Sequence, residues 1–200
     1  LNGIAAATIN SSTTLVSGGT SSSELLDGSC VVENNITHCK VDTINISGGD
    51  YFTIDTSSGV PARIYVSGDI TVGGNSKIEA EPLTECPTRL GLFGNAADTD
   101  DTNDQLVTVN GNAKINNIFL YFPDAKVGVN GGGNVAYTCT NGDCDGGNFH
   151  GTIWAKEWGL SNGNQVRITV PSNMDQCFTT YFPDLSGFDN FGNTSFVGRG

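Results

Sequence analysis

Short runs of alternating apolar and polar residues, each ended by a glycine- or asparagine-containing turn, recur along the chain. Residues 64–72 are the clearest case and read Ile-Tyr-Val-Ser-Gly-Asp-Ile-Thr-Val. Residues 44–50 follow the same plan, with Ile-Asn-Ile before Ser-Gly-Gly-Asp. A period of two places alternate side chains on opposite faces of a β-strand. The pattern therefore predicts short, half-buried strands joined by tight turns.

One strand–turn–strand unit is repeated within the chain. Residues 72–78 match residues 109–115 at five of seven places, and both units place Gly-Asn before a lysine and an isoleucine. Residues 162–168 also carry Gly-Asn before a basic residue and an isoleucine, with arginine as the basic residue and one residue more in between, and residues 129–134 form a looser copy. Glycine and asparagine tolerate the positive φ that such corners require. Stacked units would bury a continuous apolar stripe that no single unit could bury alone.

The fold class indicated is all-β, because no segment carries apolar residues at helical spacing over three turns. We expect a β-solenoid-like stack of strand–turn–strand units with loops of irregular length. The alternative is an antiparallel β sandwich or jelly roll whose hairpins happen to use Asn-Gly turns.

Three segments stand apart from the main repeat region at residues 30–170. Residues 1–29 are Ser/Thr-rich and suit a terminal strand or arm, and residues 95–104 form an acidic insertion. Residues 171–200 are rich in aromatic residues and glycine. A tail with so many large apolar side chains is expected to fold back on the core as a cap.

The charge balance excludes some classes of partner. Nine Lys and Arg residues face 21 Asp and Glu residues, which gives a net charge of −12. A nucleic-acid-binding protein needs a basic surface, so nucleic acid is not an expected partner. The longest apolar run, residues 118–122, is far too short for a membrane-spanning helix. We therefore expect no membrane insertion by this chain.

Six cysteines and several glycosylation sequons favour an extracellular or cell-surface location. Two pairs are close in sequence, Cys30 with Cys39 and Cys139 with Cys144, and each encloses a polar segment. Local disulfides at these two pairs plus a long-range Cys86–Cys177 bond form the simplest of the fifteen connectivities that six cysteines allow. Sequons that could carry glycans begin at the following residues: Asn10, Asn35, Asn45 and Asn193.

An acidic stretch suggests a calcium site. Its oxygen-bearing side chains alternate as hard-cation ligands do, at Asp98, Asp100, Thr102 and Asp104. The EF-hand pattern is not met, because its central glycine and terminal glutamate are missing. The competing interpretation is a solvated acidic loop, so Ca²⁺ is an optional ligand and no cofactor is expected to be required.

Two tryptophans suggest a second kind of site. Alternation would put Trp154, Lys156 and Trp158 on one face of an extended strand, where the indoles could stack on sugar rings. The competing interpretation is that both tryptophans close one end of the core.

Catalytic signals are weak. The chain has two histidines, His38 and His150, and lacks the Gly-x-Ser-x-Gly, His-Glu-x-x-His and phosphate-loop motifs. Polysaccharide-active enzymes on β-helices need clustered carboxylates on one face, whereas the acids here concentrate in loops. The expected function is non-catalytic, with a carbohydrate-binding module or polysaccharide-active enzyme as the alternative.

Three segments resemble a known family. Residues 63–72 look like its apolar rung around a Ser-Gly turn, residues 118–133 like its apolar strand before a glycine-rich turn, and residues 149–156 like its Gly-x-Ile-Trp-Ala strand. The family comprises extracytoplasmic β-solenoid-like domains of prepilin-like and pilus-associated bacterial surface proteins. The resemblance implies a non-catalytic surface role in pili, other filaments or adhesion. The expected partners are further copies of the chain or pilus and cell-surface components, and the two tryptophans add glycans to them.

Overall fold

The protein is all-β, as its alternation pattern predicts. The computed structural model describes residues 1, 3–82, 86, 89–96, 104–130, 138–140, 143–145, 149–159, 168–170, 177 and 180. Its strands are β1 Ala7–Ile9, β2 Thr13–Val16, β3 Cys30–Glu33, β4 Ile36–Ile46, β5 Tyr51–Asp55, β6 Ala62–Val66, β7 Ile70–Val72, β8 Lys77–Glu81, β9 Leu90–Phe93, β10 Gln105–Asn110, β11 Lys114–Asn130, β12 Thr138–Thr140, β13 Asp143–Asp145, β14 Phe149–Gly159 and β15 Ile168–Thr169. A short 3-10 helix, η1 Leu26–Gly28, precedes β3.

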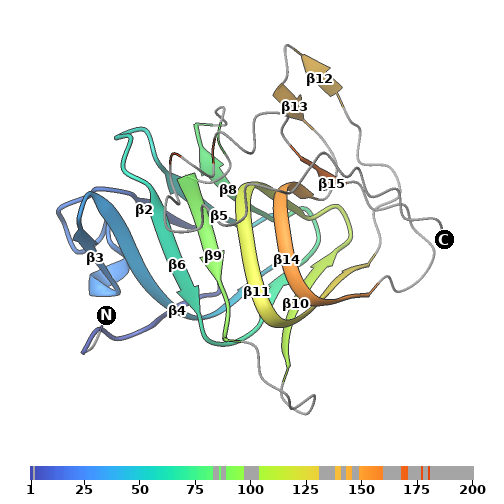
Figure 1. Ribbon diagram of the computed structural model, residues 1–200, viewed down its shortest axis with the longest axis horizontal. Helices are drawn as coiled ribbons and strands as arrows, with labels where there is room; N and C mark the ends of the chain where they lie inside the picture. The colour runs from blue at the N-terminus through green and yellow to red at the C-terminus, as the bar shows by residue number, and fades with distance from the viewer. Residues whose placement is uncertain are drawn as a thin grey trace.

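Parallel pairing organises the main sheet into three ladders. One ladder runs β2-β5-β8-β11-β14-β15, a second runs β4-β6-β9-β11-β14, and a third runs β4-β7-β10-β11-β14. Figure 1 shows the second ladder as blue, teal, green, yellow and orange strands side by side across the molecule. Among the described pairs, β3–β4 and β12–β13 are antiparallel.

The pairing closes into a six-stranded parallel barrel, β4-β6-β9-β11-β10-β7. Closure arises because β4 and β11 are long, with 11 and 17 residues, and each pairs in two ladders. The alternation pattern predicts a β-solenoid-like stack of strand–turn–strand units or, alternatively, a β sandwich or jelly roll. It does not predict that two strands continue through the corners and close a parallel barrel.

Residues at equivalent ladder positions form the core. In the second ladder Ile64, Leu92 and Leu120 lie in register and are fully buried. In the third ladder, Ile44, Ile70 and Val107 also lie in register, and each is at most 1% exposed. In-register parallel strands place like side chains directly above one another, so each apolar column packs along its own length.

The internal sequence repeat is a structural repeat. Val72 pairs with Val109 and Ile78 pairs with Ile115, so residues 72–78 and 109–115 lie directly on each other. The corner glycines, Gly74 and Gly111, both have φ of +67°. A Cβ on Gly111 would lie 3.2 Å from the Gly74 carbonyl oxygen, so the stacked corners demand glycine for space as well as for conformation. Of the other two copies, Val129 pairs with Val109 and Ile168 pairs with Phe149, and most of the rest lies outside the described residues.

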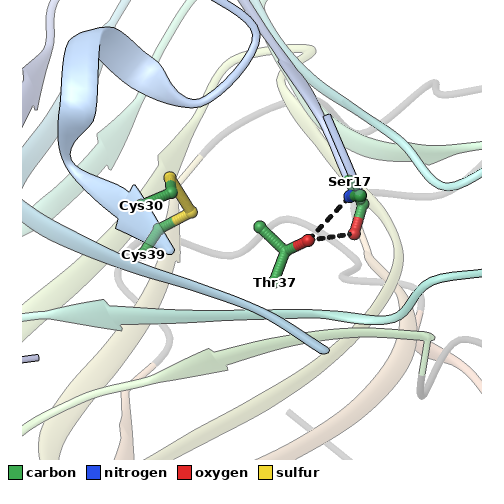
Figure 2. The surroundings of a disulfide bond; sticks show 5 residues. Ser17, Cys30, Thr37 and Cys39 are labelled. Atoms are coloured by element: carbon green, nitrogen blue, oxygen red, sulfur yellow. Dashed lines mark hydrogen bonds between the residues drawn. A yellow bond between two sulfur atoms is a disulfide. The ribbon is translucent and has the colours of Figure 1, made fainter. Parts of the chain in front are cut away.

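The N-terminal segment belongs to the main sheet. β1 pairs with β4, and β2 pairs with β5, so residues 1–29 contribute terminal strands rather than a detached arm. Figure 2 shows the adjoining hairpin, where Thr37 accepts hydrogen bonds from the Ser17 hydroxyl at 2.9 Å and from the Gly18 N–H at 2.8 Å. Ser17 and Thr37 are both fully buried, and this bonding satisfies their hydroxyls in the interior.

Two of the predicted disulfides are present. Cys30 and Cys39 face each other across the β3–β4 hairpin and are bonded (Figure 2). Cys86 is bonded to Cys177, 91 residues further along the chain. In the third pair, the backbones of Cys139 and Cys144 lie directly opposite each other in β12–β13, whereas their side chains lie outside the described residues. Within residues 171–200, where the sequence predicts an aromatic cap, the structure describes Cys177 and Thr180.

Candidate functional site

The most distinctive surface feature is a line of aromatic side chains on the outside of the second ladder. Tyr65 of β6, Phe93 of β9, Tyr121 of β11 and Trp154 of β14 occupy one register column. We call these four residues the aromatic strip. They alternate with a core-facing column of Ile64, Leu92 and Leu120, which are buried, and Ile153, which is partly buried, so they point away from the core.

Consecutive rings of the aromatic strip lie close enough to interact. The ring centroids are 5.5 Å apart from Tyr65 to Phe93, and 6.3 Å apart both from Phe93 to Tyr121 and from Tyr121 to Trp154. These separations fall in the range of favourable aromatic pairs. Tyr65, Phe93 and Tyr121 are half-buried, whereas Trp154 is 41% exposed. The four rings therefore form a continuous, partly exposed apolar surface.

A second column flanks the strip. It contains His38, Arg63, Gly91, Phe119 and Thr152, in register from β4 to β14. Phe119 is 4% exposed and supports the strip from the side, with its centroid 6.0 Å from Phe93 and 6.2 Å from Tyr121. His38 stacks on Tyr65 with a 7° angle between the rings, and Nδ1 lies 3.3 Å from the tyrosine hydroxyl.

The pKa of His38 depends on the charges at this end of the strip. Partial burial lowers the pKa of His38, and the positive charge of Arg63 lowers it further. The opposing influence of Glu33 on β3 is smaller. Lys40, in the same column as Tyr65, donates to the Ile4 carbonyl at 3.5 Å. The local field at His38 is therefore positive in a chain whose net charge is −12.

The two tryptophans occupy different columns. The β11–β14 register shifts between Phe122 and Lys126, so that Trp154 lies beside Tyr121 and Trp158 lies beside Val127. Val127 is 2% exposed and belongs to a core column, whereas Trp158 is 40% exposed. The register therefore does not place Trp154 and Trp158 in one column, and a shared Trp154–Lys156–Trp158 platform stays a prediction. Both side chains are exposed, and the competing interpretation, in which they close one end of the core, also stays a prediction.

Lys156 is held in an ion-pair cluster. Its ammonium nitrogen lies 2.9 Å from Asp104 Oδ1 and 3.8 Å from Asp124 Oδ1. The ammonium nitrogen of Lys126 lies 3.1 Å from Asp104 Oδ2 and 3.7 Å from Glu157 Oε2. The Asp104 side chain is only 3% exposed, so these two lysines neutralise a largely buried carboxylate.

Asp104 is the one predicted calcium ligand that the structure describes; Asp98, Asp100 and Thr102 lie outside the described residues. Two lysine ammonium groups already bind its carboxylate and supply the positive charge that a metal ion would supply there. Within the described part of the chain, no group of three or more His, Cys, Asp or Glu residues is placed to hold a metal ion. A calcium site in this loop stays a prediction.

Hydrogen bonds from Lys156 and Lys126 lower the pKa of Asp104, so this carboxylate stabilises the fold at neutral pH. The contribution is present above the ordinary aspartate pKa, near 3.9. It is lost as the pH falls through the lowered folded-state value. We expect Asp104→Asn to lower the thermal midpoint at pH 7 and the difference from wild type to shrink below about pH 4. Thermal melts across this range check the result, and a pH-independent difference would contradict it.

A pair of carboxylates lies on the strand β8, although the sequence pattern predicts that the acidic residues concentrate in loops. Glu79 is 4% exposed and forms an ion pair with Lys77, and it is hydrogen-bonded to Glu81. Desolvation raises the pKa of Glu81, and the hydrogen bond and negative charge of Glu79 raise it further. The Lys-Ile-Glu-Ala-Glu alternation of β8 was the available signal, because it puts both acids on the same side of the strand.

The raised pKa of Glu81 predicts a stabilising substitution. Folding disfavours the charged form of Glu81, so its charge destabilises the folded protein at neutral pH. This destabilisation vanishes below the glutamate pKa of the unfolded chain, near 4.3. We expect Glu81→Gln to increase stability at pH 7 by less than about 1 kcal/mol, since the side chain is exposed and screened. The gain should disappear by about pH 4. Melts of Glu157→Gln, which removes a pairing with Lys126, serve as the control and should show no gain.

Three of the predicted sequons begin at exposed residues, Asn10, Asn35 and Asn45, and Asn193 lies outside the described residues. Asn35 is at the tip of the β3–β4 hairpin, whereas the Thr37 hydroxyl of the same sequon is buried.

His150 lies opposite Asn116 on β11, away from the aromatic strip. The described residues contain no helix long and apolar enough to span a membrane.

Comparison with known proteins assigns no relative. No protein-family model matches the chain, and neither a curated protein nor a solved structure is significantly similar to it. The similarity to pilus-associated domains stays a prediction. Function must therefore be argued from the geometry alone.

Proposed function

We propose that this protein is a non-catalytic structural or adhesive component of the cell exterior, associated with pili or forming part of a filament. The observation that carries the proposal is the in-register parallel ladder, in which apolar columns continue from β4 to β14. Such a scaffold grows by adding further layers and presents a regular outer surface. Regular, repetitive surfaces suit adhesion and assembly.

The same ladder supports a β-solenoid-like architecture. β14 pairs with β11 outside the six-stranded ring, and β2, β5 and β8 extend a parallel ladder that the ring does not include. We infer that the ring is the part of a coiled stack in which β4 and β11 pass around a corner. The irregular spacing of the repeats then follows from loops of different length between layers.

Disulfides support an extracellular location. Cys30–Cys39 and Cys86–Cys177 are of the kind that persist in oxidising compartments and are rare in the cytosol. The proposed site of action is the cell surface, where covalent cross-links protect a displayed domain from unfolding.

Self-association through an exposed strand edge provides the first test. β3 pairs with β4, its one partner among the described strands, and its Val32 is 41% exposed. Exposed apolar edges promote pairing with another chain, and a lysine there opposes it. We expect the purified chain to form ordered polymers in negative-stain electron microscopy and Val32→Lys to suppress them.

Leu106→Lys is the matched control, because Leu106 is 46% exposed but lies on β10, which is paired on both sides. This variant should assemble like wild type. Monomers at every concentration in analytical ultracentrifugation would contradict the filament proposal.

A carbohydrate-binding module is the second candidate function, and the aromatic strip is the observation that favours it. A polysaccharide-active enzyme is a weaker form of this candidate, for which Glu79 and Glu81 are the paired carboxylates. Release of reducing sugar from acidic polysaccharides by the wild type, but not by Glu81→Gln, would support the enzyme over the binding module.

A further inference from the structure

We propose that the aromatic strip of Tyr65, Phe93, Tyr121 and Trp154 binds the chain of an acidic polysaccharide. This inference rests on the proposed adhesive function and names its ligand class. The strip lies outside the core, its exposure increases toward Trp154, and it lies along the strand-stacking direction. A long, straight ligand fits this shape better than a compact one.

The chemistry of the rings favours sugars. Aromatic rings attract the weakly positive C–H groups of a pyranose ring, and Trp154, the most exposed ring of the strip, offers the largest surface for such a contact. The four rings recur at centroid separations of 5.5 to 6.3 Å, which offers a polymer repeated contacts along one line. Because each ring is attached to a different paired strand, the spacing is held by main-chain hydrogen bonds and little ordering is required on binding.

Charge complementarity selects an acidic sugar polymer. The charged residues of the two outer columns are Lys40 and Arg63, and neither column contains Asp or Glu. Glu33 on β3 also acts on His38 at this end, but its influence is smaller than that of Arg63. Elsewhere the chain is strongly acidic, with a net charge of −12. An anionic polymer would be repelled by most of this surface but attracted to the Lys40–Arg63 end of the strip. The strip thus combines aromatic contacts for the sugar rings with cations for the carboxylates.

The tyrosine hydroxyls add polar contacts. Tyr65 Oη lies 3.3 Å from His38 Nδ1, and the lowered pKa of His38 indicates that the imidazole is mainly neutral at pH 7. A neutral imidazole beside a tyrosine can donate or accept, which suits hydroxyl-rich ligands. Lys40 and Arg63 then carry the charge recognition at this end.

Affinity electrophoresis of the 200-residue chain in gels containing polygalacturonate tests the proposal. We expect the wild type to be retarded and Trp154→Ala and Tyr121→Ala each to weaken binding about tenfold, as for central aromatic contacts in other interfaces. Lys40→Gln should weaken binding to polygalacturonate and reduce its dependence on salt. A neutral glucan in the gel should retard the wild type much less.

Trp158→Ala is the matched control, because Trp158 is as exposed as Trp154 but lies in a different column. It should bind like wild type. Equal loss in both tryptophan variants, equal retardation by the neutral glucan, or no retardation of the wild type would each overturn the inference. Polymer formation in electron microscopy is scored separately, so loss of glycan binding with intact assembly rejects this inference while leaving the filament proposal standing.

Discussion

Replacing Phe122 with alanine is expected to lower the free energy of unfolding by about 3–5 kcal/mol. Phe122 is fully buried in β11, the strand that links the three ladders. Its ring fills the space above Gly94, where a Cβ would come within 2.3 Å of Phe122 Cδ1. Removing the ring leaves a cavity between two ladders that the paired backbone is too rigid to close.

Urea denaturation followed by tryptophan fluorescence measures this loss. Leu106→Ala is the control, because Leu106 is 46% exposed, and its effect should be within about 0.5 kcal/mol of zero. A loss below about 1 kcal/mol for Phe122→Ala would mean that β11 does not have the central packing role described. Glycine at position 94 should be equally intolerant of substitution, since the same ring occupies its side-chain space.

Loss of the Cys86–Cys177 disulfide is expected to cost about 4–5 kcal/mol, the second large effect. The bond joins residues 91 apart in sequence, so it removes much freedom from the unfolded chain. The Cys30–Cys39 bond spans a separation of only 9 and is expected to contribute about 2–3 kcal/mol on the same model. The paired variants Cys86→Ala/Cys177→Ala and Cys30→Ala/Cys39→Ala test this difference directly.

Denaturation midpoints of the two double variants should therefore fall in a definite order, with the long-range variant less stable. The β3–β4 hairpin should keep its pairing without its disulfide, because four register pairs hold it together. If the short-range variant is the less stable one, the entropic account is wrong for this chain, and Cys30–Cys39 must instead support the buried Ser17–Thr37 bonding beside it (Figure 2).

The aromatic strip shows why the candidate site could be found only in part from the sequence. Trp154 stands out in a sequence because it is rare, and its alternation with Ile153 correctly indicates an outward side chain. Tyr65, Phe93 and Tyr121 lie in three other strands, and the loops between them differ in length. Their alignment depends on register across strands, which no local pattern encodes.

The position of Trp158 depends on register in the same way. Alternation along β14 predicts that Trp154 and Trp158 share a face, but β11 contributes extra residues opposite Lys156 and shifts the register. Extra residues of this kind change which β11 residue lies beside each residue of β14. Similarly, the burial of Glu79 beside Glu81 on β8 arises only when the chain folds.

What the sequence determined by itself was local: the all-β class, the Gly/Asn corners, the 72–78 and 109–115 repeat, and the Cys30–Cys39 pairing. Each follows from neighbours in the chain, through side-chain alternation, backbone conformation at glycine, or a short loop. The tertiary structure alone decided the parallel closure through β4 and β11, the line of four aromatic rings, and the commitment of Asp104 to two lysines. These depend on the register between distant strands, which burial of the apolar columns selects only when the whole chain has folded.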